Sequence, residues 1–274
     1  MAFPIFLMRT SHGACQPDST TNSFLHLTNV LIALYLRFLD TVQDSLTLKR
    51  VGLYPAMPKI RVAIDGPAGA GKSTIARLLA ERLGYIYIDT GAMYRALTLV
   101  SIEENIAPDD ANALAARLGD LDIRLANGKT YIGHRNISTD IRAPEVDARV
   151  SEVCAHPEVR REMVKRQREM AAGGGVVMEG RDIGTVVLPD AELKIFLTAS
   201  SRVRAERRAG QLRNAKIEYD IDALEKEIER RDRMDSTRED SPLKPAEDAV
   251  LIDNSKDSVE ETIERVIKIA RKRM

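Results

Sequence analysis

Eight consecutive residues, Gly66 to Ser73 (GPAGAGKS), have the types and spacing of a phosphate-binding loop, G-x-x-x-x-G-K-[ST]. Glycine allows a positive φ, so successive backbone N–H groups can turn toward one anion. Lys72 would place its charge at the β- and γ-phosphates of ATP, and Ser73 would offer its hydroxyl to Mg²⁺. The predicted ATP-binding residues are Gly66, Pro67, Ala68, Gly69, Ala70, Gly71, Lys72, Ser73 and Thr74.

The residues around this loop fit a strand before it and a helix after it. Ile60 to Ile64 is apolar apart from Arg61 and rich in β-branched residues, which predicts a buried strand. Apolar residues repeat every four positions from Ile75 to Leu83, and Gly84 supplies a helix stop. The alternative is a Gly-rich turn that binds nothing. The strand and the helix, whose positive dipole end would face the phosphates, favour nucleotide binding.

Arginine is concentrated in two later stretches, Arg202 to Arg208 and Arg230 to Arg238. A single arginine on a helix is most often a solvated surface charge. Moving a phosphoryl group between two phosphorylated molecules, however, requires charge on its oxygens to be dispersed, which guanidinium groups do bidentately. Together with the phosphate loop, the two stretches indicate phosphoryl transfer.

Strands alternate with helices along the chain, which predicts an α/β fold: a P-loop NTPase fold with a five-stranded parallel sheet and helices on both faces. The expected strands are 60–64, 86–89, 176–179, 193–197 and 249–252. Asp109 is expected to cap a helix that ends at Gly119, and Pro144 and Pro157 suit first helical positions. The second of these helices should stop at the glycines 173–175, and further helices are expected over 220–234 and 257–272.

Two further candidate strands, 122–126 and 129–133, are joined by Asn127-Gly128, a pair typical of hairpin turns. They predict a small inserted hairpin or sheet at about 120–150. In an open α/β sheet, ligands bind beyond the carboxyl ends of the strands. The stretches 89–95 and 180–182 fall at such ends. Asp253 follows the last strand and is left out of the predicted site, since it can serve simply to end that strand.

Composition narrows the class of protein. The 274 residues suffice for one large or two modest domains. Lys plus Arg equals Asp plus Glu at 41 each, so bulk charge gives no argument for a nucleic-acid or membrane partner. Cys15 and Cys154 lie far apart without metal-ligand spacing, which favours a reducing, cytoplasmic compartment and no zinc site.

Residues 1–56 differ from the rest and are expected to be an N-terminal extension, disordered or packed on the core. Their one apolar run, 24–39, has 16 residues, fewer than the roughly 20 of a membrane-spanning helix. Met57 stands directly before the first core strand, which favours the other interpretation, a mis-assigned start codon. The main domain is then 57–274.

The chain from about Lys59 to its end resembles the bacterial cytidylate kinase family of P-loop nucleoside-monophosphate kinases. The phrases that carry the resemblance are IDGPAGAGKST (64–74), DTGAMYR (89–95), EGRDIGTVVLPDAELKIFL (179–197), EIERRDRMDSTR (227–238) and PLKPAEDAVLIDNS (242–255). The resemblance implies ATP- and Mg²⁺-dependent phosphorylation of CMP and dCMP by direct in-line transfer. It also implies a monomer without nucleic-acid or membrane partners, in which the inserted sheet belongs to the monophosphate-binding region.

The resemblance also assigns roles to single residues. Asp182 matches the residue that accepts from the cytosine amino group, which would exclude uracil. The implied substrate-binding set is Thr90, Arg95, Ser151, Arg160, Arg181, Asp182, Arg231, Asp235 and Arg238. The implied catalytic set is Lys72, Arg181, Arg207 and Arg238, and an arginine-rich lid spans about 200–220 with Arg204, Arg207 and Arg208. Glu179 stands where some relatives have Asp and receives no firm role.

Three of these roles have structural alternatives. Thr90 could cap the helix that follows it. Ser151 could be an ordinary helix-surface serine. Asp182 could form a structural salt bridge with its neighbour Arg181.

Two other functions stay open at this point. The same fold could phosphorylate another nucleotide or a small alcohol such as shikimate. Against this, Arg95 and Arg181, which match monophosphate-binding positions of the family, favour a phosphorylated acceptor, and Asp182 favours a base with an amino group. A nucleotide-dependent switch or nucleic-acid-associated NTPase is the other possibility. Against it stand the zero net charge and the lack of an N-K-x-D guanine-reading motif.

Overall fold

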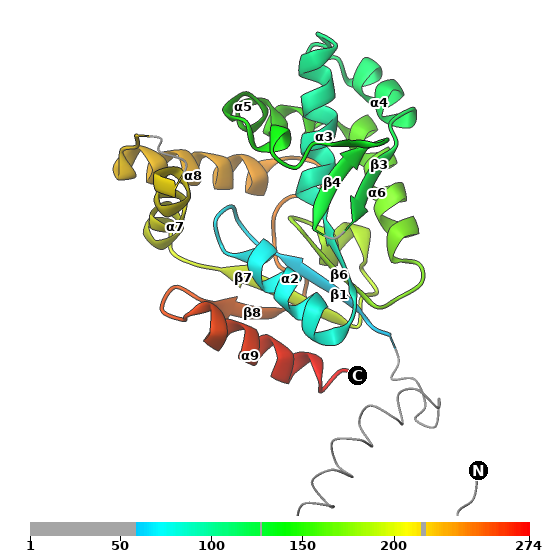
Figure 1. Ribbon diagram of the computed structural model, residues 1–274. Coiled ribbons are helices and arrows are strands. Elements are labelled where there is room, and N and C mark those ends of the chain that lie inside the picture. Colours follow the sequence, from blue (N-terminus) through cyan, green and yellow to red (C-terminus); the bar gives the residue numbers. More distant parts are fainter. Residues whose placement is uncertain (1–58, 127, 215–217) are drawn as a thin grey trace, which may run out of the picture. The chain divides into compact units, whose positions relative to one another are not determined.

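The computed structural model describes residues 59–274 apart from 127 and 215–217 (Figure 1). By the contacts between its residues, the chain divides at Met57, and Pro58–Met274 forms a compact unit. The predicted N-terminal extension, 1–56, and Asn127 of the predicted hairpin turn lie outside the described residues. The boundary at 57 therefore stays a prediction.

A five-stranded sheet forms the centre of the described unit, in the order β2-β6-β1-β7-β8. Its strands are β1 Arg61–Asp65, β2 Ile86–Asp89, β6 Val176–Gly180, β7 Leu193–Thr198 and β8 Val250–Asp253. Each neighbouring pair runs parallel. The predicted parallel sheet is confirmed, and every strand begins and ends within one residue of its predicted bounds.

Both faces of the sheet are covered, as the alternation along β1 shows. Val62 and Ile64 pack in the cluster formed with helices α2 (Lys72–Leu83) and α9 (Val259–Ala270). Ala63, between them, joins a second cluster with Met178 of β6 and the end of α6 (Pro157–Ala171). Figure 1 shows α2 and α9 side by side along one face. This is the covered parallel sheet expected from a buried run such as 60–64.

The segment between β2 and β6 builds a separate helical cluster with its own core. Its helices are α3 Thr90–Glu103, α4 Ala111–Gly119, α5 Pro144–Val153 and α6. Pro144 and Pro157 occupy first helical positions, as predicted. The expected cap at Asp109 is wrong: the carboxylate of Asp110 accepts the N–H of Ala113 at 3.0 Å, because the helix begins one residue later.

The small inserted sheet is antiparallel and has the order β3-β4-β5 (Ile123–Ala126, Lys129–Ile132 and Arg135–Asn136). The third strand was not predicted, because two residues are too few for a periodic signal. A 3₁₀ turn, η1 (Asp140–Arg142), leads from this sheet to α5.

Further elements follow β6 along the chain. A π-helical turn, η2 (Ile183–Val187), follows Asp182 directly and was not predicted. Helices α7 (Ser201–Asn214) and α8 (Ile221–Thr237) pack against each other and form the arm beside the sheet in Figure 1. Helix α7 contains the arginines of the predicted lid.

Candidate active site

The phosphate loop connects the end of β1 to the start of α2, as predicted. Gly66, Gly69 and Gly71 have φ values of 149°, 77° and 90°, a range that favours glycine. A Cβ on Gly66 would lie 1.9 Å from the carbonyl oxygen of Leu197 on β7, so only glycine fits there. Ser73 and Thr74 are exposed on the first turn of α2, where a helix N-terminus favours anions.

Side chains from outside the loop hold two of its carbonyl groups. Arg204 donates to the oxygen of Ala68 at 3.1 Å, and Arg207 and Asn254 donate to that of Ala70 at 3.3 and 3.0 Å. The C=O and N–H of a trans peptide point in opposite directions. The N–H groups of Gly69 and Gly71 therefore point away from these donors, as a phosphate cradle requires.

Lys72 folds back across the loop, and its Nζ donates to the carbonyl of Pro67 at 2.8 Å. Its side chain is buried, and burial, followed by the nearby charge of Arg181, lowers its pKa from the usual value. Three carboxylates, Glu179, Asp65 and Asp235, oppose that shift. The ammonium group of Lys72 is thus poorly solvated and lies among charges of both signs. Such a group is suited to binding a phosphate anion.

Nucleotide binding should therefore be accompanied by proton uptake at Lys72. The triphosphate replaces lost hydration with negative charge, so it raises the lowered pKa of Lys72. The uptake should grow as pH rises through the lowered pKa, because more of the free protein then carries neutral lysine. Calorimetry with a non-hydrolysable ATP analogue, in buffers of different ionisation enthalpy, measures it. Lys72→Met is the control for protons that come from the nucleotide itself. Equal uptake in both proteins at pH 7 and above would contradict the assignment.

Asp65, at the end of β1, ties the phosphate loop to the segment 180–187. Its two carboxylate oxygens accept the backbone N–H groups of Ile183 and Gly184 at 2.8 and 2.7 Å. Burial raises the pKa of Asp65 to about 6, and these two N–H groups oppose the rise. The contact fixes the start of η2 and hence the position of Asp182.

Thr90 is buried, and its hydroxyl donates to the carbonyl of Glu179 at 2.7 Å. The alternative that Thr90 caps α3 is wrong: Asp89 is the cap, and its carboxylate accepts the N–H of Ala92 at 2.9 Å. Glu179 itself accepts from Tyr87 at 2.7 Å and interacts with the hydroxyl of Ser73. Burial, followed by the charge of Asp89, raises the pKa of Glu179.

Asp182 and Arg160 form a buried ion pair, with the two side chains 8% and 3% exposed. Arg238 approaches the other oxygen of Asp182 at 3.9 Å, and the guanidinium of Arg160 lies 5.9 Å from the ring centre of Tyr94. The alternative that Asp182 pairs with Arg181 is wrong, because Arg181 turns to Asp235, with Nε 2.9 Å from the carboxylate. Two predicted base-contacting residues, separated by 22 positions, thus meet in the fold.

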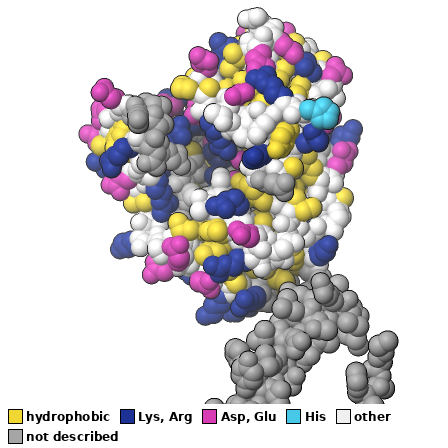
Figure 2. Space-filling view, in the orientation of Figure 1, with side chains coloured by type: hydrophobic (Ala, Val, Ile, Leu, Met, Phe, Trp, Pro, Cys, Tyr) yellow, Lys and Arg dark blue, Asp and Glu magenta, His cyan; other side chains and the backbone are white. Residues whose placement is uncertain are grey.

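The predicted arginines on α8 and just beyond it are short of partners. Arg231 Nε and Arg238 Nη2 are buried and donate no hydrogen bond to any group in the described part of the chain. Burial lowers the pKa of both, and the next largest cause is the charge of Arg181 for Arg231 and of Arg160 for Arg238. Figure 2 shows Lys and Arg side chains around the hollow beside the α7–α8 arm. Buried, mutually repelling guanidinium groups with unpaired donors are expected where an anion binds.

The remaining predicted residues lie at the edges of this group. Arg95 on α3 pairs with Asp147 of α5 at 2.5 Å. Arg207 is fixed by Asn254, whose side-chain and main-chain oxygens it meets at 3.0 and 2.9 Å. Ser151 is half-buried on α5, and the structure gives no contact that decides between its two roles. The carboxylate of Asp253 accepts hydrogen bonds from the backbone N–H and the hydroxyl of Ser255.

Three residues that the sequence reasoning missed are Asp65, Asn254 and Asp147. Asp65 and Asn254 stood inside family phrases, IDGPAGAGKST and LIDNS, which was the signal that could have found them. Asp147 had no such signal, because its two partners are Arg95 and Arg208 of distant helices.

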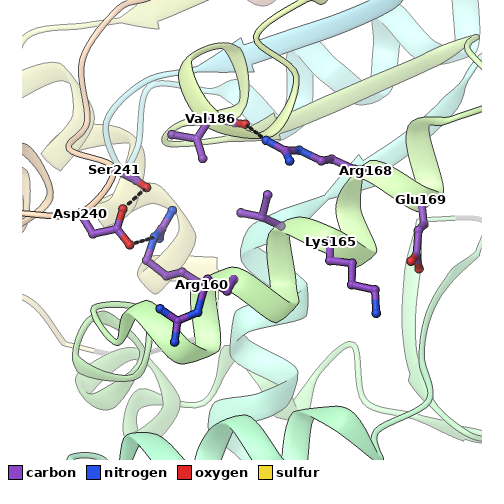
Figure 3. A pocket seen from close by; sticks show the side chains of 9 residues that line it. Arg160, Lys165, Arg168, Glu169, Val186, Asp240 and Ser241 are labelled. Atoms are coloured by element: carbon purple, nitrogen blue, oxygen red, sulfur yellow. Dashed lines mark hydrogen bonds and ion pairs between the residues drawn. The ribbon is translucent and has the colours of Figure 1, made fainter.

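A cavity of about 450 Å³ lies on the outer side of Arg160 (Figure 3). Its wall includes Lys165 and Arg168 of α6 and the turn at Asp240 and Ser241. In Figure 3, Arg168 is turned toward the carbonyl of Val186 and Asp240 toward Ser241. Asp240 lies 3.9 Å from the Nε of Arg160. The cavity thus borders Arg160 of the candidate base-reading pair.

Comparison with known proteins identifies the family. The cytidylate kinase family model matches residues 62–272. A cytidylate kinase of Geobacillus sp. is 50% identical over 219 residues, which are 78% of this chain and 98% of that protein. One of Listeria monocytogenes is 47% identical over 215 residues (77% and 96%), and one of Caldicellulosiruptor bescii is 48% identical over 217 residues (78% and 96%). The chain belongs to the cytidylate kinase family.

Membership of the cytidylate kinase family makes the protein a nucleoside-monophosphate kinase built on a P-loop. A shikimate kinase structure from Bacteroides thetaiotaomicron is similar with a TM-score of 0.42 and 14% identity, covering 77% of this chain and 98% of that one. At this level the likeness carries no argument about the acceptor. Within the described residues, no helix is both long and apolar enough to cross a membrane.

Proposed function

We propose that the protein transfers the γ-phosphoryl group of ATP to the 5′-phosphate of CMP, and of dCMP, in one in-line step. The observation that carries the proposal is the buried Asp182 beside a group of arginines with unpaired donors, next to the phosphate loop. A carboxylate accepts hydrogen bonds and therefore suits the amino group of cytosine. Membership of the cytidylate kinase family supports the same acceptor.

The proposed catalytic residues work by position and charge. Lys72 meets the β- and γ-phosphates of ATP, and Arg181, Arg207 and Arg238 neutralise charge as the phosphoryl group moves. Arg95, Arg181 and Arg231 hold the acceptor phosphate. The 2.9 Å contact with Asp235 fixes Arg181. No general base is needed, because the acceptor phosphate is already an anion at neutral pH.

Asp182 distinguishes the cytosine of CMP from the uracil of UMP. Cytosine presents N4–H₂ to the carboxylate, whereas uracil presents a carbonyl oxygen that would leave the carboxylate unpaired. Arg160 holds Asp182 in place and donates to the base. Thr90 and Ser151 complete the acceptor site, and the arginines of α7 close over the phosphates so that water is excluded.

Mg²⁺ fits this site. The Ser73 hydroxyl is exposed at the start of α2, and the carboxylate of Glu179 interacts with it. Mg²⁺ prefers such oxygen ligands together with substrate phosphates. We assign Ser73 as the protein ligand, with Glu179 as its neighbour. The bound ion would offset negative charge on the phosphates.

The test is ADP release from ATP and Mg²⁺ with each of CMP, dCMP, UMP, AMP, GMP and shikimate as acceptor. Rapid turnover with CMP and dCMP, and little with AMP or GMP, is expected. Rapid turnover with a purine monophosphate or with shikimate would show that the acceptor is that compound and not CMP. Slow ADP release that is equal with and without an acceptor would indicate hydrolysis and favour a switch or NTPase.

The monomeric state, the lack of a nucleic-acid or membrane partner, and a cytoplasmic location stay predictions. Sedimentation at working concentration tests the first. Retention on DNA that falls with salt would contradict the second.

A further inference from the structure

Asp147 lies between the candidate acceptor site and the candidate lid. It belongs to α5, and each of its carboxylate oxygens takes one arginine: Oδ1 is 2.5 Å from Arg95 of α3, and Oδ2 is 2.8 Å from Arg208 of α7. The charge of Asp147 also acts on Arg231 of α8. The Asp147 carboxylate therefore contacts arginines of two helices, and its charge also acts on an arginine of a third.

This arrangement differs from an ordinary surface ion pair. The side chains of Asp147 and Arg95 are only 20% and 14% exposed, so solvent screens their attraction less than on an open surface. Arg95 and Arg231 are the residues assigned to the acceptor phosphate, and Arg208 lies on the lid. A phosphate bound by these arginines would use the guanidinium groups that Asp147 now engages.

We propose that Asp147 is a positioning residue that competes with the acceptor phosphate for Arg95 and Arg208. It keeps Arg95 and Arg208 together and neutralised, and it yields them to the monophosphate. The incoming phosphate carries about two negative charges and three acceptor oxygens, against one charge and two oxygens on the carboxylate. The proposal rests on the proposed function, because it takes Arg95 as an acceptor-binding residue.

Competition by Asp147 and a purely structural role predict opposite changes in anion affinity when the charge of Asp147 is removed. Removing its charge leaves the same arginines in place with less negative charge around them, so anions should bind more tightly. Loss of a purely structural contact would instead loosen the arginines and weaken anion binding.

The test compares wild type with Asp147→Asn, which keeps the size of the side chain and removes its charge. The dissociation constants of CMP and of inorganic phosphate should each fall by about two- to fivefold, the size expected for a partly exposed charge pair. Cytidine, which lacks the phosphate, should bind with unchanged affinity. Calorimetry with each of the three ligands measures this directly.

Matched variants separate the possible results. Asp147→Glu keeps the charge and should bind CMP as wild type does. Asp257→Asn removes a carboxylate from an exposed pair with Arg265 and should change nothing. Unchanged or weaker phosphate binding by a folded Asp147→Asn would overturn the proposal, as would equal tightening for cytidine. If Asp147→Asn does not fold, Asp147→Ser is measured by the same criteria.

Failure of the proposed function would look different. The wild-type protein would then bind ATP but neither bind CMP nor turn it over. The effect of Asp147→Asn on inorganic phosphate would still report on the arginines around Asp147.

Discussion

Lys72→Met is expected to lower kcat by about 10²- to 10³-fold while changing the KM for ATP much less. Methionine fills a similar volume, so the buried site is not emptied. What it removes is the ammonium group that meets the charge developing on the transferred phosphoryl. A contribution made mainly in the transition state appears in kcat rather than in KM.

Lys194→Met is the matched control for this variant. Lys194 is also buried, and its Nζ also bonds a proline carbonyl, that of Pro189, at 2.5 Å. It pairs with Asp248 at 2.9 Å as well. Its replacement should lower the free energy of unfolding and leave kcat close to wild type. A wild-type kcat in Lys72→Met would show that the loop does not bind the reacting phosphates.

Asp182→Asn is expected to lower kcat/KM for CMP by about 10²-fold, corresponding to one to two good hydrogen bonds, and to leave kcat/KM for UMP unchanged or raised. The carboxylate accepts from the cytosine amino group, whereas the amide of asparagine can donate to the uracil carbonyl. The ATP site should be untouched, so the KM for ATP should stay near wild type. Initial rates over a range of CMP and UMP concentrations give the two ratios.

Two further variants serve as comparisons for Asp182→Asn. Asp182→Ala leaves the buried Arg160 without its partner and should also unfold more easily, because an uncompensated buried charge is costly. Asp240→Asn removes the carboxylate on the outer side of Arg160 and should leave the CMP-to-UMP preference intact. An equal fall for CMP and UMP in Asp182→Asn would show that Asp182 supports the site without reading the base.

The phosphate loop, the five parallel strands and the family can all be predicted from the amino-acid sequence. The strands were predicted to within one residue because each is a short apolar run, bounded by turn residues, whose pattern is local. The loop was predicted because glycines at fixed spacing and Lys72 act through the backbone next to them. The errors were also local. A cap was expected one residue early, at Asp109, and β5 was too short to give a signal.

The partners of the charged residues were decided only by the tertiary structure. Arg181 was expected to pair, if at all, with its neighbour Asp182, but it meets Asp235, 54 positions away. Asp182 meets Arg160, and Asp147 meets Arg208 across 61 positions. Sequence spacing does not predict such contacts, because the attraction between two charges depends on their distance in the folded chain and not on their separation in the sequence. The residue types of the site are visible in the sequence, whereas their pairing depends on how the helices pack around the sheet.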